Sequence, residues 1–171
     1  VFASSNHVVA GWEDDHLDEL WSGEMVIDRH TPRRPDSFYG VSKAFGEDLG
    51  RYYVDQVGTP ARFYALRIGG LLGARYDSPY GYAEKARDRG EFEYEPGTEA
   101  YREYTRRTQA MWHSRRDAAH LVDCCLRADT RPFGVFYGVS DNSQRWFDLE
   151  DARAAVGYDP RDDAAEYDPP V

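Results

Sequence analysis

Two apolar runs in the first 70 residues predict buried strands of a parallel sheet. The chain opens on an apolar pair and passes into small hydroxyl side chains, which predicts a strand that ends at Ser4 or Ser5. Residues 61–68 (ARFYALRI) predict the next strand, which closes at the glycine pair that follows. Polar side chains just past the carboxyl end of such strands stand where open α/β sheets bind ligands.

Residues 46–58, between these strands, predict a helix that packs on the sheet. Its apolar side chains recur at the spacing of one helical face: Leu49, Tyr52, Tyr53 and Val57. Ser37, in the preceding Pro-Asp-Ser segment, provides N-cap chemistry, and Gly58 provides the stop. Strand, loop, helix and strand make one βαβ unit, so the predicted fold class is α/β with a parallel sheet.

The second half of the chain predicts further elements of the same kind. Residues 114–128 have the pattern of an amphipathic helix, residues 133–139 that of a strand, and residues 147–156 that of a short helix that ends at a glycine. Asp141 and Asn142 follow this strand, and we expect them near the edge of a site at the carboxyl end of the sheet.

Two stretches lack a clean hydrophobic period. Residues 11–34 predict a polar loop whose Trp12 and Trp21 edge the binding pocket. Residues 71–108 are rich in Tyr, Glu, Arg, Gly and Pro, and two interpretations stand: a lid over the substrate that brings specificity, or a surface insertion without a catalytic role. The glycine cluster at residues 69–73 lacks the Gly-x-Gly-x-x-Gly spacing of a dinucleotide-binding loop, so it predicts a strand-to-loop turn.

Tyr39 and Lys43 are the residues whose spacing points to catalysis. On a helix, positions i and i+4 share one face, so the phenol and the amine lie side by side. An ammonium beside a phenol favours the phenolate, which makes the tyrosine a general base for taking a proton from an alcohol. The pattern alone is weak, because Tyr39 can equally be a packing tyrosine and Lys43 a solvated surface lysine. The chain has two lysines against nineteen arginines, however, so a lysine at this position is not background.

Composition bounds the class of protein. With 171 residues, one domain is the default. The net charge of −10 argues against nucleic acid and against an anionic membrane as partners. The sequence has no run of 18 apolar residues and therefore predicts no membrane span. Many acidic residues with almost no lysine resemble the composition of proteins from salt-loving archaea, and an acidic mesophile is the alternative.

The cysteines and the isolated histidines predict neither a disulfide nor a metal site. Cys124 and Cys125 are adjacent on a predicted helix, which suits neither a structural disulfide nor a metal pair and fits a reducing cytoplasm. His113 and His120 are too isolated from other ligand types to predict zinc. We therefore expect no resident metal.

Several motifs together resemble the extended branch of the short-chain dehydrogenase/reductase superfamily. The segments that carry the resemblance are SSNHVV, PDSFYGVSKAFGEDLGRYY, LRIGG, TQAMWHSRRDAAHLVDCC, FYGVSDN and VGYDPRDDAAE. Within that branch the chain is most similar to the uronate dehydrogenases and the archaeal NAD-dependent glucose-6-phosphate dehydrogenases, from its first residue to about Glu166. The combination is specific, although each motif singly is not. It implies the carboxyl-terminal part of a Rossmann-like doubly wound parallel sheet with a small substrate-binding portion.

The resemblance implies a role for each matching residue around the cofactor. Tyr39 takes the proton from a sugar hydroxyl while hydride leaves the same carbon for the nicotinamide of NAD. Lys43 assists the tyrosine and hydrogen-bonds the nicotinamide ribose, and Ser5 orients the reacting oxygen. Ile68 and Gly70 match cofactor-contacting positions, and at Gly70 such a contact comes from the backbone, because glycine has no side chain.

On the substrate side, the resemblance implies that Ser5, Asn6 and His7 line the sugar site. Arg107 matches an arginine that grips the anionic group of the substrate, since a guanidinium fork suits a carboxylate or a phosphate. Simpler interpretations stand beside these. Ser5 can be a strand-end cap, His7 a core or loop histidine, and Arg107 one member of a solvated basic helix face.

The Gly-rich turn of a dinucleotide-binding unit is absent from this sequence. In the family this fingerprint belongs to the first strand–helix turn, well before the tyrosine. Because the chain opens inside a strand without an initiator methionine, we expect it to be the carboxyl-terminal part of a longer enzyme, inactive alone. We divide this single-domain fragment, residues 1–171, into a catalytic part (1–70), the 71–108 segment and a substrate-side part (109–171).

The expected function is NAD-dependent oxidation of a sugar hydroxyl, with NADP not excluded. The substrate is an acidic sugar, a uronate or a sugar phosphate, and the product is a lactone. The alternatives are a nucleotide-sugar epimerase or dehydratase, a non-catalytic NAD-binding module, and an inactive truncated product. The resemblance also makes a homo-oligomer through the helix with Tyr39 and Lys43 a plausible assembly.

Overall fold

A parallel sheet forms the centre of the structure. In the computed structural model, which describes residues 1–91 and 94–169, the sheet has three strands in the order β1-β2-β3, all parallel. The strands are β1 (Phe2–Ser5), β2 (Phe63–Ile68) and β3 (Phe133–Gly138). Ser5 lies beside Ile68 in the register, and Ile68 beside Gly138, so the strands end at one edge. The predicted strands and the α/β class are confirmed.

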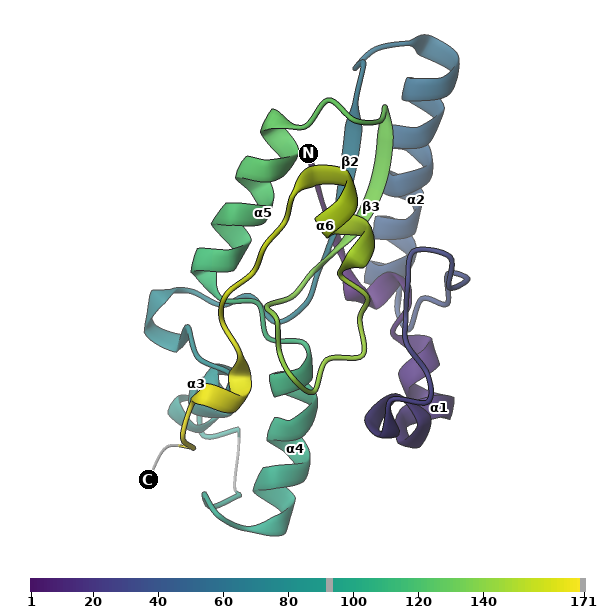
Figure 1. Cartoon of the computed structure of the whole chain (residues 1–171). Coiled ribbons are helices and arrows are strands. Elements are labelled where there is room, and N and C mark those ends of the chain that lie inside the picture. Colours follow the sequence, from purple (N-terminus) through teal and green to yellow (C-terminus); the bar gives the residue numbers. More distant parts are fainter. Residues whose placement is uncertain (92–93, 170–171) are drawn as a thin grey trace.

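Helices cover both faces of the sheet and its carboxyl edge. They are α1 (Gly11–Ser22), α2 (Phe38–Tyr52), α3 (Gly81–Asp88), α4 (Glu99–Ala110), α5 (Arg115–Arg127) and α6 (Glu150–Val156). Figure 1 shows α2 and α5 on either side of the strands, and α1, α3 and α4 beyond the ends toward which the strands run. Short helical turns complete the chain: Asn6–Val8, Tyr53–Val57, Ala74–Tyr76 and Ala164–Glu166. Within the described ranges, no helix combines the length and the apolar character needed to cross a bilayer.

The face of the sheet toward α5 carries the main apolar core. Leu66 of β2 and Phe136 of β3 are register partners and are buried together with Leu121 of α5. Burial of side chains of this size contributes about 1.5–3 kcal/mol each. Ser114 accepts a hydrogen bond from Asp117 N and so begins α5 where the sequence predicts it. The helix and strand expected in the second half are therefore confirmed.

Helix α2 has the predicted caps. Ser37 accepts a hydrogen bond from Gly40 N at the start of the helix, and Gly58, with φ of +75°, closes the π-helical turn that follows it. Tyr39 and Lys43 lie in the first turns of this helix, as the i, i+4 argument requires.

The face through which α2 packs is not the predicted one. The expected apolar contacts are 43–56% exposed: Leu49, Tyr52, Tyr53 and Val57. Glycines face the sheet instead, because a Cβ at Gly50 would lie 2.3 Å from the Phe63 ring and one at Gly46 would lie 2.4 Å from the Phe2 ring. Strand aromatics thus pack against the helix backbone, and glycine gives no signal in a hydrophobic period. The outward apolar face lies on the helix for which association is expected, and association stays a prediction.

A buried ion pair joins α2 to the sheet. Glu47 accepts hydrogen bonds from Arg67 Nε and Nη2, both at 2.9 Å, and from Ser4 Oγ at 2.6 Å. Arg67 Nη1 donates to Tyr137 Oη at 2.9 Å, and that hydroxyl donates to Asp28 O at 3.1 Å. Burial opposes the charge on Arg67, but its partners, Glu47 first, outweigh burial and raise the pKa of the guanidinium. The network links α2 to each strand of the sheet.

The segment predicted as a polar loop contains a helix, α1. Its buried residues, Gly11, Glu13 and Leu20, form no apolar stripe, so a hydrophobic period does not reveal it. Gly11 N donates to Arg34 O at 2.9 Å at the start of the helix, and Gly23, with φ of +77°, ends it. Helix α3 and most of α4 likewise lie in the 71–108 segment, which has no clean hydrophobic period.

His113 is buried in the connection between α4 and α5. Tyr158 Oη donates to Val139 O at 2.8 Å and lies 3.2 Å from His113 Nε2, so this ring nitrogen is the donor to the tyrosine. Nδ1 has no hydrogen-bond partner among the described residues. Burial lowers the pKa of His113 to about 4, against the opposing effect of Asp117.

Replacement of Glu47 by alanine is expected to destabilise the protein by about 3–5 kcal/mol, because it leaves the Arg67 charge buried without its partner. Urea unfolding measures the loss. The double variant Glu47→Leu with Arg67→Met removes both charges and is expected to lose less than the single variant. Asp48→Ala, which breaks the exposed pair with Arg33, is the matched control and is expected to cost at most about 1 kcal/mol. Equal losses for Glu47→Ala and Asp48→Ala would contradict the role of the buried pair.

His113 is expected to make stability fall as the pH drops from about 6.5 to 4. The unfolded chain binds a proton on this histidine below its ordinary pKa of 6.5, whereas the folded chain does so only near 4. Titration of His113 therefore lowers the free energy of unfolding by about 2 kcal/mol between pH 7 and pH 5. Urea unfolding at the two pH values should give a smaller difference for His113→Gln than for the unchanged protein. The exposed His30→Gln is the control, and an unchanged difference in His113→Gln would refute the assignment.

Candidate active site

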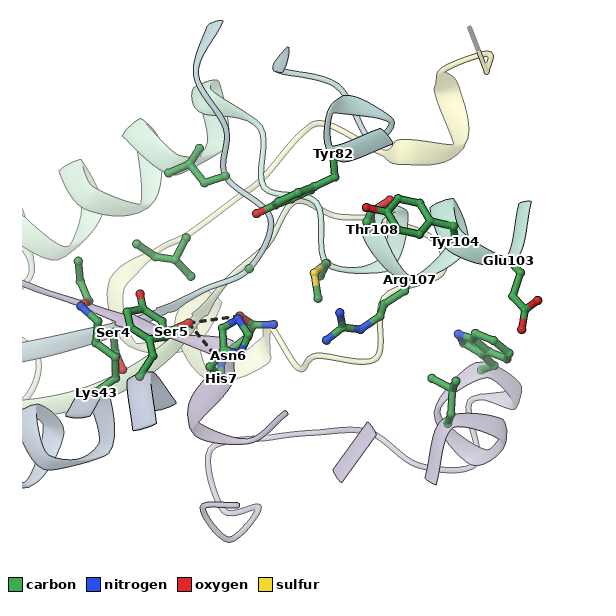
Figure 2. Close-up of a pocket in the computed structure, with 18 of the residues that line it drawn as sticks. Ser4, Ser5, Asn6, His7, Lys43, Tyr82, Glu103, Tyr104, Arg107 and Thr108 are labelled. Carbon is green, nitrogen blue, oxygen red and sulfur yellow. Dashed lines mark hydrogen bonds between the residues drawn. The ribbon is translucent and has the colours of Figure 1, made fainter. Parts of the chain in front are cut away.

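A pocket of about 800 Å³ opens at the carboxyl ends of β1 and β2. Its inner wall is the end of β1 with the turn after it, the first turns of α2 and the end of β2, while α1, α3 and α4 supply the outer wall (Figure 2). The predicted site residues that line it come from separated parts of the chain: Ser5, Asn6, His7, Tyr39, Lys43, Ile68 and Arg107. This is the edge of the sheet at which open α/β proteins bind ligands.

Tyr39 and Lys43 stand together at the inner wall. Lys43 Nζ lies 5.3 Å from the centroid of the Tyr39 ring and donates a hydrogen bond to Ala3 O at 2.9 Å. The β1 backbone thus holds the amine beside the phenol, which does not fit a freely solvated lysine. Tyr39 is 53% exposed, so the core does not enclose it as it encloses a packing tyrosine. The arrangement leaves the phenol accessible from the pocket.

Ser5 is both a cap and a pocket residue. Its Oγ accepts a hydrogen bond from His7 N at 3.2 Å and lies 3.4 Å from Asn6 Oδ1 (Figure 2). The first bond caps the 3-10 turn that follows β1, so the strand-end cap expected as the simpler interpretation is present. The hydroxyl nonetheless lines the pocket, and the two roles coexist.

His7 is held at the pocket by Asp36. The distance from His7 Nδ1 to Asp36 Oδ2 is 2.7 Å, and the imidazole meets the Tyr39 ring edge-on, with 5.6 Å between centroids. Burial works against ionisation of Asp36, but hydrogen bonds with Ser37 and His7 outweigh it and lower the pKa of this carboxyl. When a carboxylate accepts a hydrogen bond from Nδ1–H of an imidazole, the other ring nitrogen, Nε2, is left to accept a hydrogen bond from a ligand.

Arg107 faces the pocket from the last turn of α4. Its Nε donates to Glu13 Oε2 at 2.5 Å, and Glu13 is only 5% exposed. Of its neighbours, Arg102 bonds on the exposed surface to Glu99 and a loop carbonyl, and Arg106 covers the Trp21 ring. The three arginines of the predicted basic helix face therefore differ in their surroundings, and Arg107 is the one of the three that lines the pocket.

Glu13, which does not itself line the pocket but pairs with Arg107, is a residue that the sequence analysis missed. Burial raises its pKa, and the charge and hydrogen bond of Arg107 oppose that rise. It lies in a run of acidic residues, WEDDHLDEL, and nothing in that run distinguishes the one carboxylate that turns inward. The contact with Arg107 spans 94 positions of the sequence, so no local pattern reports it.

The 71–108 segment forms much of the outer wall of the pocket. Tyr82, Tyr104 and Thr108 are among its pocket residues in Figure 2. Burial raises the pKa of Tyr82, which suits a neutral hydroxyl at the wall. Trp21 of α1 lines the pocket beside them, as predicted. Movement of the segment as a lid stays a prediction.

Ile68 and Gly70 were both expected to contact the cofactor. Ile68 lines the pocket, whereas Gly70 does not. The backbone N–H of Gly70 donates to Met111 O at 2.7 Å, and its carbonyl accepts from His113 N at 3.0 Å. These bonds form a short parallel bridge with Trp112. The donor that a backbone contact to a cofactor would use at Gly70 is therefore already engaged.

Three other residues expected at the pocket edge do not line it. Asp141 pairs with Arg145 and Arg153, and Asn142 is buried with its Nδ2 donating to Trp112 O at 2.8 Å. Both therefore brace the segment after β3. Trp12 packs against the apolar core and donates its indole N–H to Pro32 O at 2.8 Å. Strand position alone does not reveal which way the side chains of Asp141 and Asn142 turn, and Trp12 lies on a helix that the sequence did not predict.

Cysteine and histidine form no ligand cluster in the part of the chain that the structure describes. Cys124 and Cys125 are free thiols, and burial raises the pKa of Cys125 to about 12. Among the described residues no group of three or more His, Cys, Asp or Glu side chains could hold a metal ion.

Comparison with known proteins gives relatives that are sugar dehydrogenases. No family model matches the chain. It is 38% identical over 170 residues to the NAD-dependent glucose-6-phosphate dehydrogenase of Haloferax volcanii, covering 98% of this chain and 54% of that protein. It is 34% identical to the L-arabinose 1-dehydrogenase (NAD(P)(+)) of the same organism, covering 96% of this chain and 59% of that protein.

Among solved structures, a mutated uronate dehydrogenase superposes with a TM-score of 0.65 and 28% identity, over 96% of this chain and 46% of that one. The chain is thus homologous to NAD-dependent sugar dehydrogenases, and its Rossmann-like fold is confirmed. The chain spans about half the length of the relatives that it matches.

Proposed function

We propose that this chain carries the proton-transfer and substrate residues of an NAD-dependent sugar dehydrogenase, which oxidises the anomeric hydroxyl of an acidic sugar to a lactone. The observation that carries the proposal is the meeting of Tyr39, Lys43 and Ser5 at one wall of a pocket with Arg107 at the opposite wall. The first three are the groups that alcohol oxidation needs, and the guanidinium suits the anionic group of the substrate. The homologous dehydrogenases support the same reaction class.

Tyr39 acts as the general base. Its accessible phenol takes the proton of the sugar hydroxyl, and the Lys43 ammonium, 5.3 Å from the ring, stabilises the phenolate that this transfer requires. The bond from Lys43 to Ala3 O keeps the amine in place. Ser5 donates to the reacting oxygen and fixes its orientation, and Asn6 and His7 bind neighbouring hydroxyls of the sugar.

The residues at the inner wall fit the nicotinamide end of NAD. Ala3, Ile68 and Leu71 form an apolar surface there, and Lys43 has further N–H groups for a ribose hydroxyl. NAD, when bound, accepts the hydride that leaves the sugar carbon. This sequence contains no Gly-x-Gly-x-x-Gly turn for the pyrophosphate, so we assign only the nicotinamide end to these residues.

Compartment and salt preference belong to the same proposal. Free thiols at Cys124 and Cys125 fit a reducing cytoplasm. The acid-rich, lysine-poor composition fits a halophilic protein, and two relatives come from Haloferax volcanii. Activity is therefore best measured at high salt.

The test is NAD reduction by the complete gene product with glucuronate, galacturonate and glucose 6-phosphate. Turnover on at least one acidic sugar is expected, and Tyr39→Phe should lower kcat by about 10²–10⁴-fold, because the general base is lost. Tyr52→Phe, which alters an exposed tyrosine on the same helix outside the pocket, is the matched control and should leave kcat unchanged.

Two results would count against the proposal. Turnover that survives in Tyr39→Phe would remove the tyrosine from the mechanism. Absence of turnover on every acidic sugar, with NAD still bound, would favour a nucleotide-sugar epimerase or dehydratase, or a non-catalytic NAD-binding module.

A further inference from the structure

Glu13 and Arg107 form a contact in which the two side chains differ in burial and in which each uses only one of its polar atoms. Arg107 is a long side chain, close to half exposed, whereas Glu13 is buried. The contact uses only Nε of the guanidinium and only Oε2 of the carboxylate, at 2.5 Å. Nη1 and Nη2 donate no hydrogen bond to the described residues, and Figure 2 shows the guanidinium directed across the pocket toward Asn6 and His7. The free donors therefore face the space that a ligand would fill.

The backbone that carries Glu13 is held in place, because the residues at the start of α1 are packed into the core. Val8, Val9 and Ala10, directly before the helix, are 0–2% exposed. A Cβ at Gly11 would lie 2.8 Å from Arg34 O, so the backbones touch at that point. Glu13 follows two residues later, and its N–H donates to Ala10 O at 2.9 Å. The carboxylate is thus attached to a fixed element, while the arginine reaches it from the end of a flexible side chain.

An arginine held at Nε binds an anion differently from a free one. The bond to Glu13 removes much of the rotational freedom of the guanidinium and leaves the Nη pair to bind two oxygens side by side. Ordering that arginine in advance lowers the entropy that an anion would otherwise have to remove on binding. The carboxylate also offsets part of the positive charge, so orientation and charge act in opposite directions on anion affinity, and experiment can separate them.

We propose that Glu13 is the positioning residue for anion recognition in this pocket: it holds Arg107 by Nε so that Nη1 and Nη2 bind the carboxylate or phosphate of the sugar. The proposal rests on the proposed function, since it assumes that the pocket binds an acidic sugar. It adds a positioning residue on α1 to a site whose anion-binding group, Arg107, lies on α4. Glu13 does not touch the sugar, and its effect passes through Arg107.

The experiment compares Glu13→Ala and Glu13→Gln in the complete gene product, with the acidic sugar that the unchanged protein oxidises and with neutral glucose. Glu13→Ala should raise KM for the acidic sugar about tenfold, leave kcat within about twofold, and leave kcat/KM for glucose within about twofold. Glu13→Gln keeps an oxygen that accepts from Nε and should restore most of the loss. A merely structural defect would lower kcat on both sugars.

Two further variants make the test specific. Asp14→Asn removes the same charge one residue away on the exposed side of α1, and KM should not change. In an Arg107→Gln background, Glu13→Ala should have no further effect on KM for the acidic sugar, because the residue acts only through the arginine.

An unchanged or lower KM for the acidic sugar in Glu13→Ala would overturn the inference, and a lower value would mean that Glu13 competes with the substrate for Arg107. An equal effect of Glu13→Ala with and without Arg107 would also overturn it. If the unchanged protein oxidises no acidic sugar, the proposed function fails and the inference fails with it, and this outcome is distinct from the two before.

Discussion

The buried ion pair between Glu47 and Arg67 is the interaction on which the site depends. Two opposite charges removed from water satisfy each other only in a narrow geometry, because no solvent can replace a misplaced partner. The pair therefore fixes how α2 is rotated on the sheet. Tyr39 and Lys43 lie eight and four residues before Glu47, so the three share one helical face. Ser4 donates to the same carboxylate, and the next residue of β1 is the proposed catalytic serine, so one contact places the strand end and the helix together.

The close approach of α2 makes that ion pair possible. Gly46 and Gly50 leave no side chain between helix and strands, and the aromatic rings of Phe2 and Phe63 fill the space against the helix backbone. A helix that packed through its apolar residues would stand farther from the sheet, out of reach of a short bidentate contact. The apolar residues of α2 are left on the outer surface as a consequence.

The outer wall of the pocket depends on a different kind of contact. Helices α1 and α4 are far apart in the sequence, yet Glu13 meets Arg107 and Trp21 lies under Arg106 between them. The sheet edge with helix α2 thus presents the proposed proton-transfer groups, and two helices remote in the sequence, joined by polar and aromatic contacts, present the proposed anion-binding group. The relatives of the chain differ in the sugar that they are named for.

The sequence by itself determined the parts that local physics controls. Apolar runs report strands, and four-residue spacing on a capped helix places Tyr39 beside Lys43 whatever surrounds the helix. The tertiary structure alone decided which face of α2 meets the sheet, that residues 11–22 are helical, and that Glu13 turns inward to Arg107. Each of these depends on a partner distant in the sequence or on a glycine, which carries no hydrophobic signal, and the energy of a buried charge exists only once its partner is in place.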